Sequence, residues 1–304
     1  MRSKFLGTGV ALITPFQANG EIDFGAMRRL LEHVSQGVVD YLVVLGTTGE
    51  SATLNEAEKK DILAFVKANN PKRLPIMYGL GGNNTREVLE QIHQTDWQGV
   101  DAVLSVSPYY NKPSQRGIYE HYVSIADACP VPVVLYNVPG RTQSNVTATT
   151  TLKLATHPNI IGIKEASGDL IQCMEIAKNK PSDFLLISGD DLLTLPMVSF
   201  GAIGVISVLA NAFPAIFTQM VNEALDHQLE SASRHLFRFL AINPLMYEEG
   251  NPVGLKQVLQ QMGICRNEVR LPLAPASEPL IAKITAALME FEPVFQPVSV
   301  AKSF

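Results

Sequence analysis

The sequence predicts an α/β protein, a (β/α)8 TIM barrel with a C-terminal helical subdomain. Eight short apolar segments recur between residues 10 and 206. Most of them lack alternating polar residues, which is typical of strands buried on both faces of a parallel sheet. Amphipathic stretches separate the apolar segments, as expected of crossover helices. Beyond about residue 227 the remaining chain reads as helical, with a proline-rich stretch from Leu271 onward. We therefore expect a barrel over residues 1–227 and a helical subdomain over residues 228–304.

Each expected element has a local reason. Phe24–Gln36 and Asn55–Lys67 are amphipathic, and Asn55 suits a helix cap followed by acidic residues in the first turn. An open doubly wound sheet is the alternative, but the glycine-rich dinucleotide fingerprint is missing after the first strand. The expected strands are Val10–Ile13, Tyr41–Leu45, Pro75–Tyr78, Ala102–Val106, Val131–Tyr136, Ile160–Ile163, Phe184–Ile187 and Ile203–Ile206.

Composition narrows the classes of function. Of the 304 residues, 46% are hydrophobic and 17% charged, which suits a chain with a large core. The net charge of -5 comes from interspersed charges without a basic stripe, so nucleic acid is not an expected partner. The sequence has no apolar signal stretch and no apolar run of membrane-spanning length, so we expect a cytoplasmic protein that does not bind membranes.

The cysteines and histidines indicate no metal and no disulfide framework. The three cysteines are widely spaced and include no Cys-x-x-Cys pair, as expected of reduced thiols. The six histidines are scattered and lack the paired helical spacing that binds zinc. We therefore expect chemistry without a bound metal.

Polar segments follow four of the expected strands. In a (β/α)8 barrel the reactive groups lie where strands give way to the following loops, so these segments are expected at one mouth. They are Gly46–Ser51, Ser107–Asn111, Tyr136–Thr142 and Lys164–Glu165.

Lys164 is the most informative of these residues, because it alone among the lysines directly follows an apolar strand. A desolvated lysine loses its proton more readily, and the neutral amine can attack a carbonyl to form an imine. The alternative is a lysine at the barrel rim, paired with Glu165 or Glu50. This residue alone leaves both interpretations open.

Three hydroxyl residues are candidates for a proton relay beside Lys164. Tyr136 reaches the same mouth from the neighbouring strand, and Thr47 and Tyr110 are candidates to orient its phenol. The alternative is ordinary, because tyrosine and threonine are common in strands and Gly46–Ser51 can be a tight turn.

Two further features concern the substrate. Arg141 offers a planar fork suited to a carboxylate, or is simply a surface arginine. The acidic segment Gly189–Asp191 after the seventh strand disfavours a phosphoryl group where many barrels bind one. We therefore expect an unphosphorylated keto acid.

In combination, four segments resemble the dihydrodipicolinate synthase family, and the resemblance covers essentially the whole chain. The wider superfamily of Schiff-base aldolases includes N-acetylneuraminate lyase and 2-keto-3-deoxy sugar-acid aldolases. Paired threonines, paired tyrosines and Gly-Arg-Thr favour the synthase branch. The segments are Gly46–Ser51, Ser107–Pro113, Tyr136–Thr142 and Gly162–Ser167.

The resemblance implies a reaction and a set of roles. Pyruvate condenses with L-aspartate 4-semialdehyde to give 4-hydroxy-tetrahydrodipicolinate, the committed step toward diaminopimelate and lysine, without an external cofactor. The resemblance also implies a homotetramer, in which Tyr110 reaches the adjacent active site. By resemblance, Lys164 forms the imine, and the proton relay consists of Tyr136, Thr47 and Tyr110. The resemblance also implies that Thr48 and the backbone at Ile206 hold pyruvate and that Gly189 lines the pocket. Arg141 is implied to receive the carboxylate of the second substrate.

The resemblance further implies feedback inhibition by L-lysine between subunits. Glu87 offers a carboxylate for the side-chain ammonium of the ligand. Glu56 and Lys59 stand where family members often have histidines, and a Lys59–Glu87 pair would compete with the ligand. The alternative is that these are solvated charges on helix faces. The implied contacts are Ser51, Ala52, Lys59, Asn83, Glu87 and Tyr109.

Two rival functions remain at this point. A pyruvate-dependent sugar-acid aldolase would keep Lys164 and Tyr136 but should not require Arg141. A non-catalytic keto-acid sensor would be expected to have lost part of the relay, and the sequence retains it.

Overall fold

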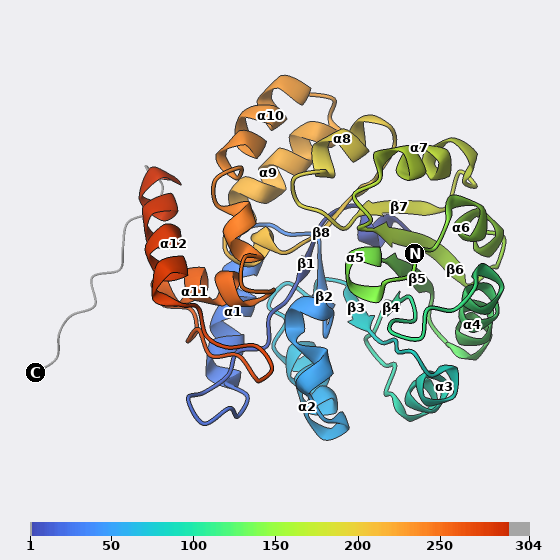
Figure 1. The fold of residues 1–304 in the computed structure, drawn as a ribbon, viewed down its shortest axis with the longest axis horizontal. Coiled ribbons are helices and arrows are strands. Elements are labelled where there is room, and N and C mark those ends of the chain that lie inside the picture. Colours follow the sequence, from blue (N-terminus) through green and yellow to red (C-terminus); the bar gives the residue numbers. More distant parts are fainter. Residues whose placement is uncertain (1, 292–304) are drawn as a thin grey trace, which may run out of the picture.

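The computed structural model describes residues 2–291, which contain a closed barrel of parallel strands (Figure 1). Each strand pairs with the next along the chain, and β8 closes the barrel against β1. The predicted (β/α)8 architecture is confirmed. The strands are β1 Gly7–Ala11, β2 Tyr41–Val44, β3 Ile76–Gly79, β4 Ala102–Val106, β5 Val133–Asn137, β6 Ile160–Glu165, β7 Leu185–Ser188 and β8 Gly204–Ser207.

The longer helices surround the barrel on its outside (Figure 1). The two helices predicted individually are both present: α1 has the expected bounds, and α2 begins one residue after its cap, Asn55. Asn55 Oδ1 accepts from the backbone N–H of Glu58, whose side chain accepts from the N–H of Asn55. The barrel helices are α1 Phe24–Gln36, α2 Glu56–Ala68, α3 Thr85–Gln94, α4 Gln115–Ala128, α5 Pro139–Thr142, α6 Ala148–Leu154, α7 Leu170–Asn179, α8 Thr194–Ser199 and α9 Pro214–Leu225.

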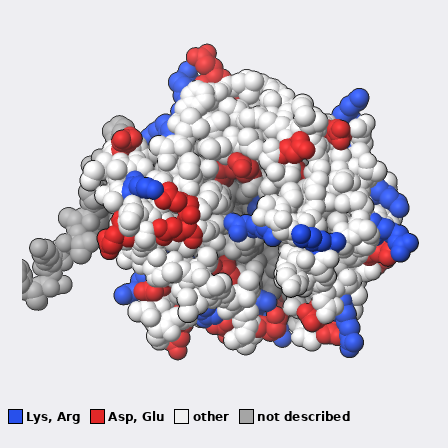
Figure 2. Space-filling model, viewed as in Figure 1, with Lys and Arg blue, Asp and Glu red and all other residues white. Residues whose placement is uncertain are grey.

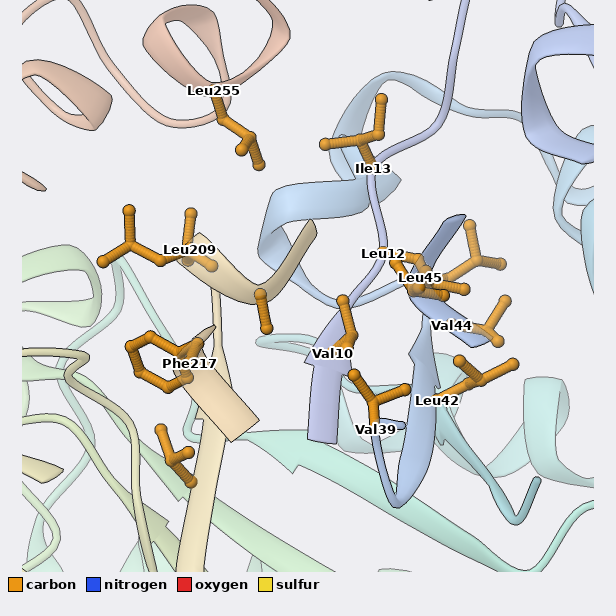
Figure 3. Close-up of a cluster of buried hydrophobic side chains, with 14 of the residues drawn as sticks. Val10, Leu12, Ile13, Val39, Leu42, Val44, Leu45, Leu209, Phe217 and Leu255 are labelled. Atoms are coloured by element: carbon orange, nitrogen blue, oxygen red, sulfur yellow. The ribbon is translucent and has the colours of Figure 1, made fainter. Parts of the chain in front are cut away.

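The apolar core has two layers, because side chains on a strand point alternately to its two faces. One layer fills the barrel and includes Val43, Met77 and Ile206. The other lies between the strands and the helices and includes the residues drawn in Figure 3, such as Leu42 and Phe217. Strands buried on both faces explain why their sequences read as continuous apolar runs.

After α9 the described chain contains helices and no strand. These are α10 Leu229–Arg238, α11 Val253–Gln261 and α12 Glu278–Phe291. The ring of Phe291 lies 4.6 Å from that of Phe213, so α12 packs against the start of α9. The division at residue 227 stays a prediction, and residues 292–304 of the expected subdomain lie outside the described part. No helix within residues 2–291 has the length and apolar character needed to cross a membrane.

Candidate active site

Lys164 and Tyr136 lie side by side at the carboxyl ends of β6 and β5. The two residues are partners in the strand register, and Lys164 Nζ is 4.4 Å from the centre of the Tyr136 ring. Lys164 is only 6% exposed. An ammonium over an aromatic face is attracted by the ring quadrupole, whereas the neutral amine is a nucleophile. The arrangement therefore provides a buried amine beside a phenol at the barrel mouth.

The two carboxylates considered as rim partners of Lys164 are bound elsewhere. Glu50 pairs with Lys256, and Glu165 accepts hydrogen bonds from Asn137 and Gln172. Within residues 2–291, Lys164 makes no ion pair at all. The interpretation of Lys164 as a rim lysine paired with either carboxylate is therefore wrong.

Gly189 makes room for the Lys164 side chain. A Cβ atom built on Gly189 would lie 3.1 Å from Lys164 Cε and 2.6 Å from the Cβ of Ala166. Those separations are shorter than normal carbon contacts, so a larger residue would displace the lysine or the following segment. Ile206, on β8, is 1% exposed and belongs to the layer that fills the barrel.

A cavity of about 560 Å³ opens at this mouth. Thr47, Tyr136 and Arg141 line it. Lys164, Thr48, Gly189, Ile206 and Tyr110 are not among its lining residues. Tyr136 therefore connects the cavity to Lys164, because it lines the cavity and Lys164 Nζ lies over its ring. The six residues implied for lysine binding all line the cavity as well: Ser51, Ala52, Lys59, Asn83, Glu87 and Tyr109.

Among the residues implied for lysine binding, Lys59 pairs with a different carboxylate from the one considered from the sequence. Lys59 Nζ pairs with Glu56 at 2.8 Å, and no Lys59–Glu87 ion pair occurs within residues 2–291. The competing Lys59–Glu87 pair considered from the sequence is therefore not formed here. The face seen in Figure 2 carries both acidic and basic side chains, and several acidic ones gather at its left.

Tyr110 lies apart from the other relay candidates. Its side chain is 87% exposed, and its backbone has a left-handed φ of 73°, which is uncommon for a bulky residue. Its neighbour Tyr109 is half as exposed, at 42%, and lines the cavity. A single chain therefore brings Thr47 and Tyr136 to one cavity but does not bring Tyr110 there.

The turn that carries Thr47 and Thr48 is fixed by residues far along the chain. Thr48 Oγ1 accepts a hydrogen bond from Asn251 Nδ2 at 3.0 Å. Glu50 has a left-handed φ of 52°, and its carboxylate accepts from Lys256 Nζ and from the backbone N–H of Arg270. Lys256 lies on α11. Its contact with Glu50 has no local signal, because the two are 206 residues apart.

The acidic segment after β7 turns out to serve local structure. Asp190 Oδ1 accepts from the backbone N–H groups of Leu192 and Leu193. Asp191 is 2% exposed, and its Oδ2 accepts from the backbone N–H groups of Val208 and Leu209. Burial raises the pKa of Asp191 to about 6, against these hydrogen bonds. Asp191 therefore fastens the segment after β7 to the end of β8.

No cluster of three or more histidine, cysteine, aspartate or glutamate side chains within residues 2–291 has the geometry to hold a metal ion. The chemistry available at the mouth is that of a buried amine, a phenol, hydroxyls and a guanidinium. Such a constellation on a (β/α)8 barrel suits a lyase that acts on a carbonyl substrate.

Comparison with known proteins is more specific. The sequence matches the Dihydrodipicolinate synthetase family over residues 4–290, and the chain belongs to this family. It is 55% identical over 283 residues to the 4-hydroxy-tetrahydrodipicolinate synthase of Cytophaga hutchinsonii, which covers 93% of this chain and 95% of that protein. The corresponding protein of Flavobacterium psychrophilum is 48% identical over 277 residues, 91% and 94% of the two chains.

Solved structures agree with this assignment. A dihydrodipicolinate synthase from Cyanidioschyzon merolae with lysine bound has a TM-score of 0.91 and 37% identity, covering 95% of this chain and 98% of the other. Identities of this size over nearly full length identify the chain as a lyase of this family.

Proposed function

We propose that Lys164 is the nucleophile with which this chain condenses pyruvate and L-aspartate 4-semialdehyde to 4-hydroxy-tetrahydrodipicolinate. The observation that carries the proposal is the environment of Lys164, which is buried, outside any ion pair within residues 2–291, and 4.4 Å above the Tyr136 ring. Close relatives that bear the name of this synthase support the reaction.

The reaction can be written as a sequence of steps that uses only the two substrates and side chains of this protein. The neutral amine of Lys164 adds to the keto carbon of pyruvate, and loss of water leaves an imine. Removal of a methyl proton gives an enamine, whose carbon attacks the aldehyde carbon of the semialdehyde. The amine of the semialdehyde then displaces Lys164 from the former keto carbon, which closes the ring. No external cofactor enters this sequence of steps.

Tyr136 and Thr47 are the proposed proton carriers, with Tyr110 as the third member. The centre of the Tyr136 ring lies 4.4 Å from Lys164 Nζ, which supports Tyr136 as the residue that carries protons to and from the carbinolamine and the imine. The high exposure of Tyr110 supports its contribution to a neighbouring subunit. Membership of the family supports the homotetramer. Thr48, Gly189 and the backbone of Ile206 are the proposed pyruvate contacts.

Arg141 is the proposed site for the carboxylate of the second substrate. Its side chain lines the same cavity as Tyr136, and a guanidinium can bind a carboxylate through two parallel hydrogen bonds. This cavity would also hold L-lysine through Ser51, Ala52, Lys59, Asn83, Glu87 and Tyr109. A solved relative with lysine bound supports the regulatory proposal.

Trapping of the imine tests the central assignment. The protein is incubated with pyruvate and borohydride, and the reduced adduct is mapped by peptide mass. The expected result is one adduct per chain on Lys164, lost in Lys164→Ala. An adduct on another lysine, or no adduct, contradicts the proposal.

A further inference from the structure

A second set of polar residues lies behind the active site, on the outer face of the same strands. Asn137 and Glu165 follow Tyr136 and Lys164 by one residue and are themselves partners in the β5–β6 register. Side chains alternate between the two faces of a strand. Tyr136 and Lys164 face the barrel interior, so Asn137 and Glu165 point away from it. Asn137 is fully buried and Glu165 is 1% exposed.

The outer residues bind one another closely. Asn137 Nδ2 donates to both carboxylate oxygens of Glu165, at 3.1 and 3.0 Å. Gln172 Nε2, from α7, donates to Glu165 Oε2 at 3.0 Å, and the backbone N–H of Ser167 donates to Oε1 at 2.8 Å. We call Asn137, Asn145, Glu165 and Gln172 the outer cluster. It joins the ends of β5 and β6, the segment before α6, and α7.

The outer cluster also closes the loop that carries Arg141. Asn137 Oδ1, at the start of this loop, accepts from the backbone N–H of Val146 at its end, at 2.9 Å. Asn145 accepts from Asn137 and donates to Gln172 at 2.8 Å. The outer cluster therefore fixes both ends of the loop.

The acceptor pattern explains why a carboxylate is used. Both oxygens of Glu165 receive donors, and within residues 2–291 it makes no ion pair with a cation. Burial raises the pKa of Glu165, and the surrounding donors oppose that rise. An unpaired buried carboxyl group is costly. In a glutamine at this position one oxygen becomes an NH2 group, which cannot accept. The hydrogen bond from either Gln172 or the Ser167 N–H would then be lost.

We propose that Glu165, held by Asn137 and Gln172, is a positioning residue that sets the spacing of Lys164 and Tyr136 and the placement of Arg141. Glu165 does not touch the reacting atoms. It acts because any shift of β6 against β5 moves Lys164 relative to the Tyr136 ring. Displacements of about 1 Å at a reacting group can cost about 100-fold in rate. This inference rests on the proposed role of Lys164.

Glu165→Gln is the first test. The expected result is a rate of imine formation from pyruvate, followed by quenching with borohydride at short times, that falls by about 10-fold or more per folded chain. The KM for the semialdehyde should rise as the Arg141 loop loosens, while the endpoint yield of the Lys164 adduct stays near one. A purely structural role would lower the folded fraction and leave these rates per folded chain unchanged.

Two further variants keep the test decisive if Glu165→Gln folds poorly. Gln172→Met removes the donor on α7 and leaves Glu165 intact, so a smaller loss of the same kind is expected. Glu175→Gln is the matched control, a carboxylate-to-amide change at an exposed position of the same helix. Native rates in both Glu165→Gln and Gln172→Met would overturn the inference. An absent pyruvate adduct in the unaltered protein would instead overturn the proposed function.

Discussion

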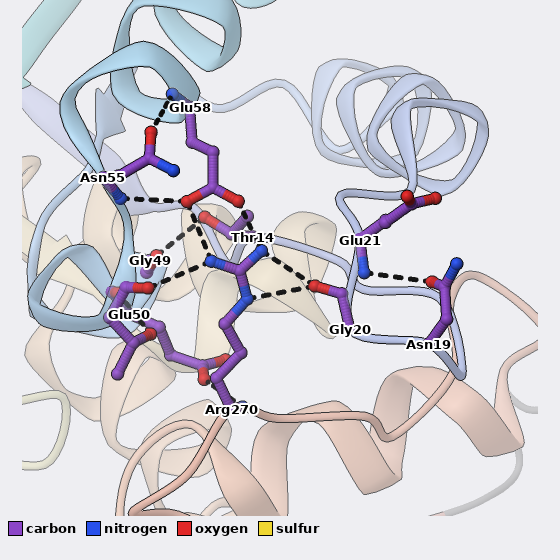
Figure 4. Close-up of polar contacts among 10 residues, drawn as sticks. Thr14, Asn19, Gly20, Glu21, Gly49, Glu50, Asn55, Glu58 and Arg270 are labelled. Atoms are coloured by element: carbon purple, nitrogen blue, oxygen red, sulfur yellow. Dashed lines mark hydrogen bonds and ion pairs between the residues drawn. The ribbon is translucent and has the colours of Figure 1, made fainter.

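The ammonium of Lys256 lies 2.5 Å from the carboxylate of Glu50, with 0% and 2% of the two side chains exposed. Lys256 also donates to the backbone carbonyl of Glu268 and lies 4.2 Å from the centre of the Phe16 ring. Burial lowers the pKa of Lys256, whereas Glu50 acts to raise it. Figure 4 shows Glu50 beside Arg270. The guanidinium of Arg270 donates to Glu58 and to the backbone carbonyl of Gly20. The Gly46–Ser51 turn is therefore held from α11 and the segment after it.

Lys256→Met should destabilise the protein by about 3–5 kcal/mol, because Glu50 would remain buried without its partner. Urea unfolding followed by circular dichroism measures the change. The double variant with Glu50→Gln should lose less than the sum of the single losses, since no unpaired charge remains. Lys283→Met is the control, because its pair with Glu248 is exposed and should contribute about 1 kcal/mol or less. Equal losses at both lysines would contradict the prediction.

Asp191 should make stability depend on pH. Its pKa is raised from 3.8 to about 6 in the folded protein, so folding favours the protonated form. Its contribution is therefore fully present below pH 3.8 and is lost as pH rises through about 6. The loss approaches about 3 kcal/mol, at about 1.4 kcal/mol per pKa unit. The free energies of unfolding of the native protein and of Asp191→Asn are measured from about pH 3.5 to about pH 7.5, a range that brackets both pKa values. The native protein should lose stability with rising pH more steeply than the variant. Parallel curves would refute it.

Arg141→Ala should separate the two substrates. Imine formation with pyruvate should persist, because Lys164 and Tyr136 are unchanged. Turnover of the semialdehyde should fall by about 100-fold, on the scale of a lost charge-assisted contact of about 3 kcal/mol. Steady-state rates and borohydride trapping measure the two steps. Arg116→Ala, at an exposed arginine of α4, is the control and should behave as the native protein does. Near-native turnover in Arg141→Ala, or efficient cleavage of sialic acid by the native protein, would favour an aldolase.

L-Lysine should inhibit initial rates at millimolar-scale concentration, and Glu87→Thr should weaken that inhibition by removing the carboxylate expected to bind the ligand ammonium. Glu90→Thr is a matched control on α3, because Glu90 pairs with Arg86 and does not line the cavity. An unaffected native enzyme, or a Glu87→Thr variant inhibited as strongly as the native form, would remove the regulatory proposal without touching the catalytic one.

Gly189→Ala should slow imine formation by about 10-fold or more, because the new methyl group would crowd Lys164 Cε and the Ala166 side chain. Gly140→Ala is the control, since a Cβ there meets nothing within 4 Å. Rapid-quench trapping with pyruvate measures the rate. If both variants react at the native rate, Gly189 does not limit the space around Lys164.

Apolar runs in the sequence mark most of the strands, whereas a strand without such a run is not marked. The first strand was expected at Val10–Ile13, but β1 begins at Gly7. Its glycine-rich start has no apolar signature, and Gly9 is needed because a Cβ there would lie 2.2 Å from the Tyr41 ring. The nearness of Lys164 and Tyr136 followed from neighbouring strand ends in a barrel.

The supporting contacts could not be predicted in the same way. Asn251 and Thr48 are 203 residues apart, and no local pattern encodes their hydrogen bond. Glu165 and Asn137 carried a periodic signal, since each follows a candidate residue by one position. That signal places them on the opposite face of the sheet but does not reveal that they bind each other.

Tyr136, Arg141 and Glu87 line one cavity, so an inhibitor bound there would act on the binding of the second substrate directly. The semialdehyde, bound at Arg141, and the inhibitor would displace solvent from one shared cavity, so each would alter the hydration and the electric field met by the other. Communication of that sort requires no relay of moving segments, and it would act in both directions, because coupling between two bound molecules is reciprocal. The semialdehyde would accordingly change the affinity for the inhibitor by the same factor as the inhibitor changes the affinity for the semialdehyde.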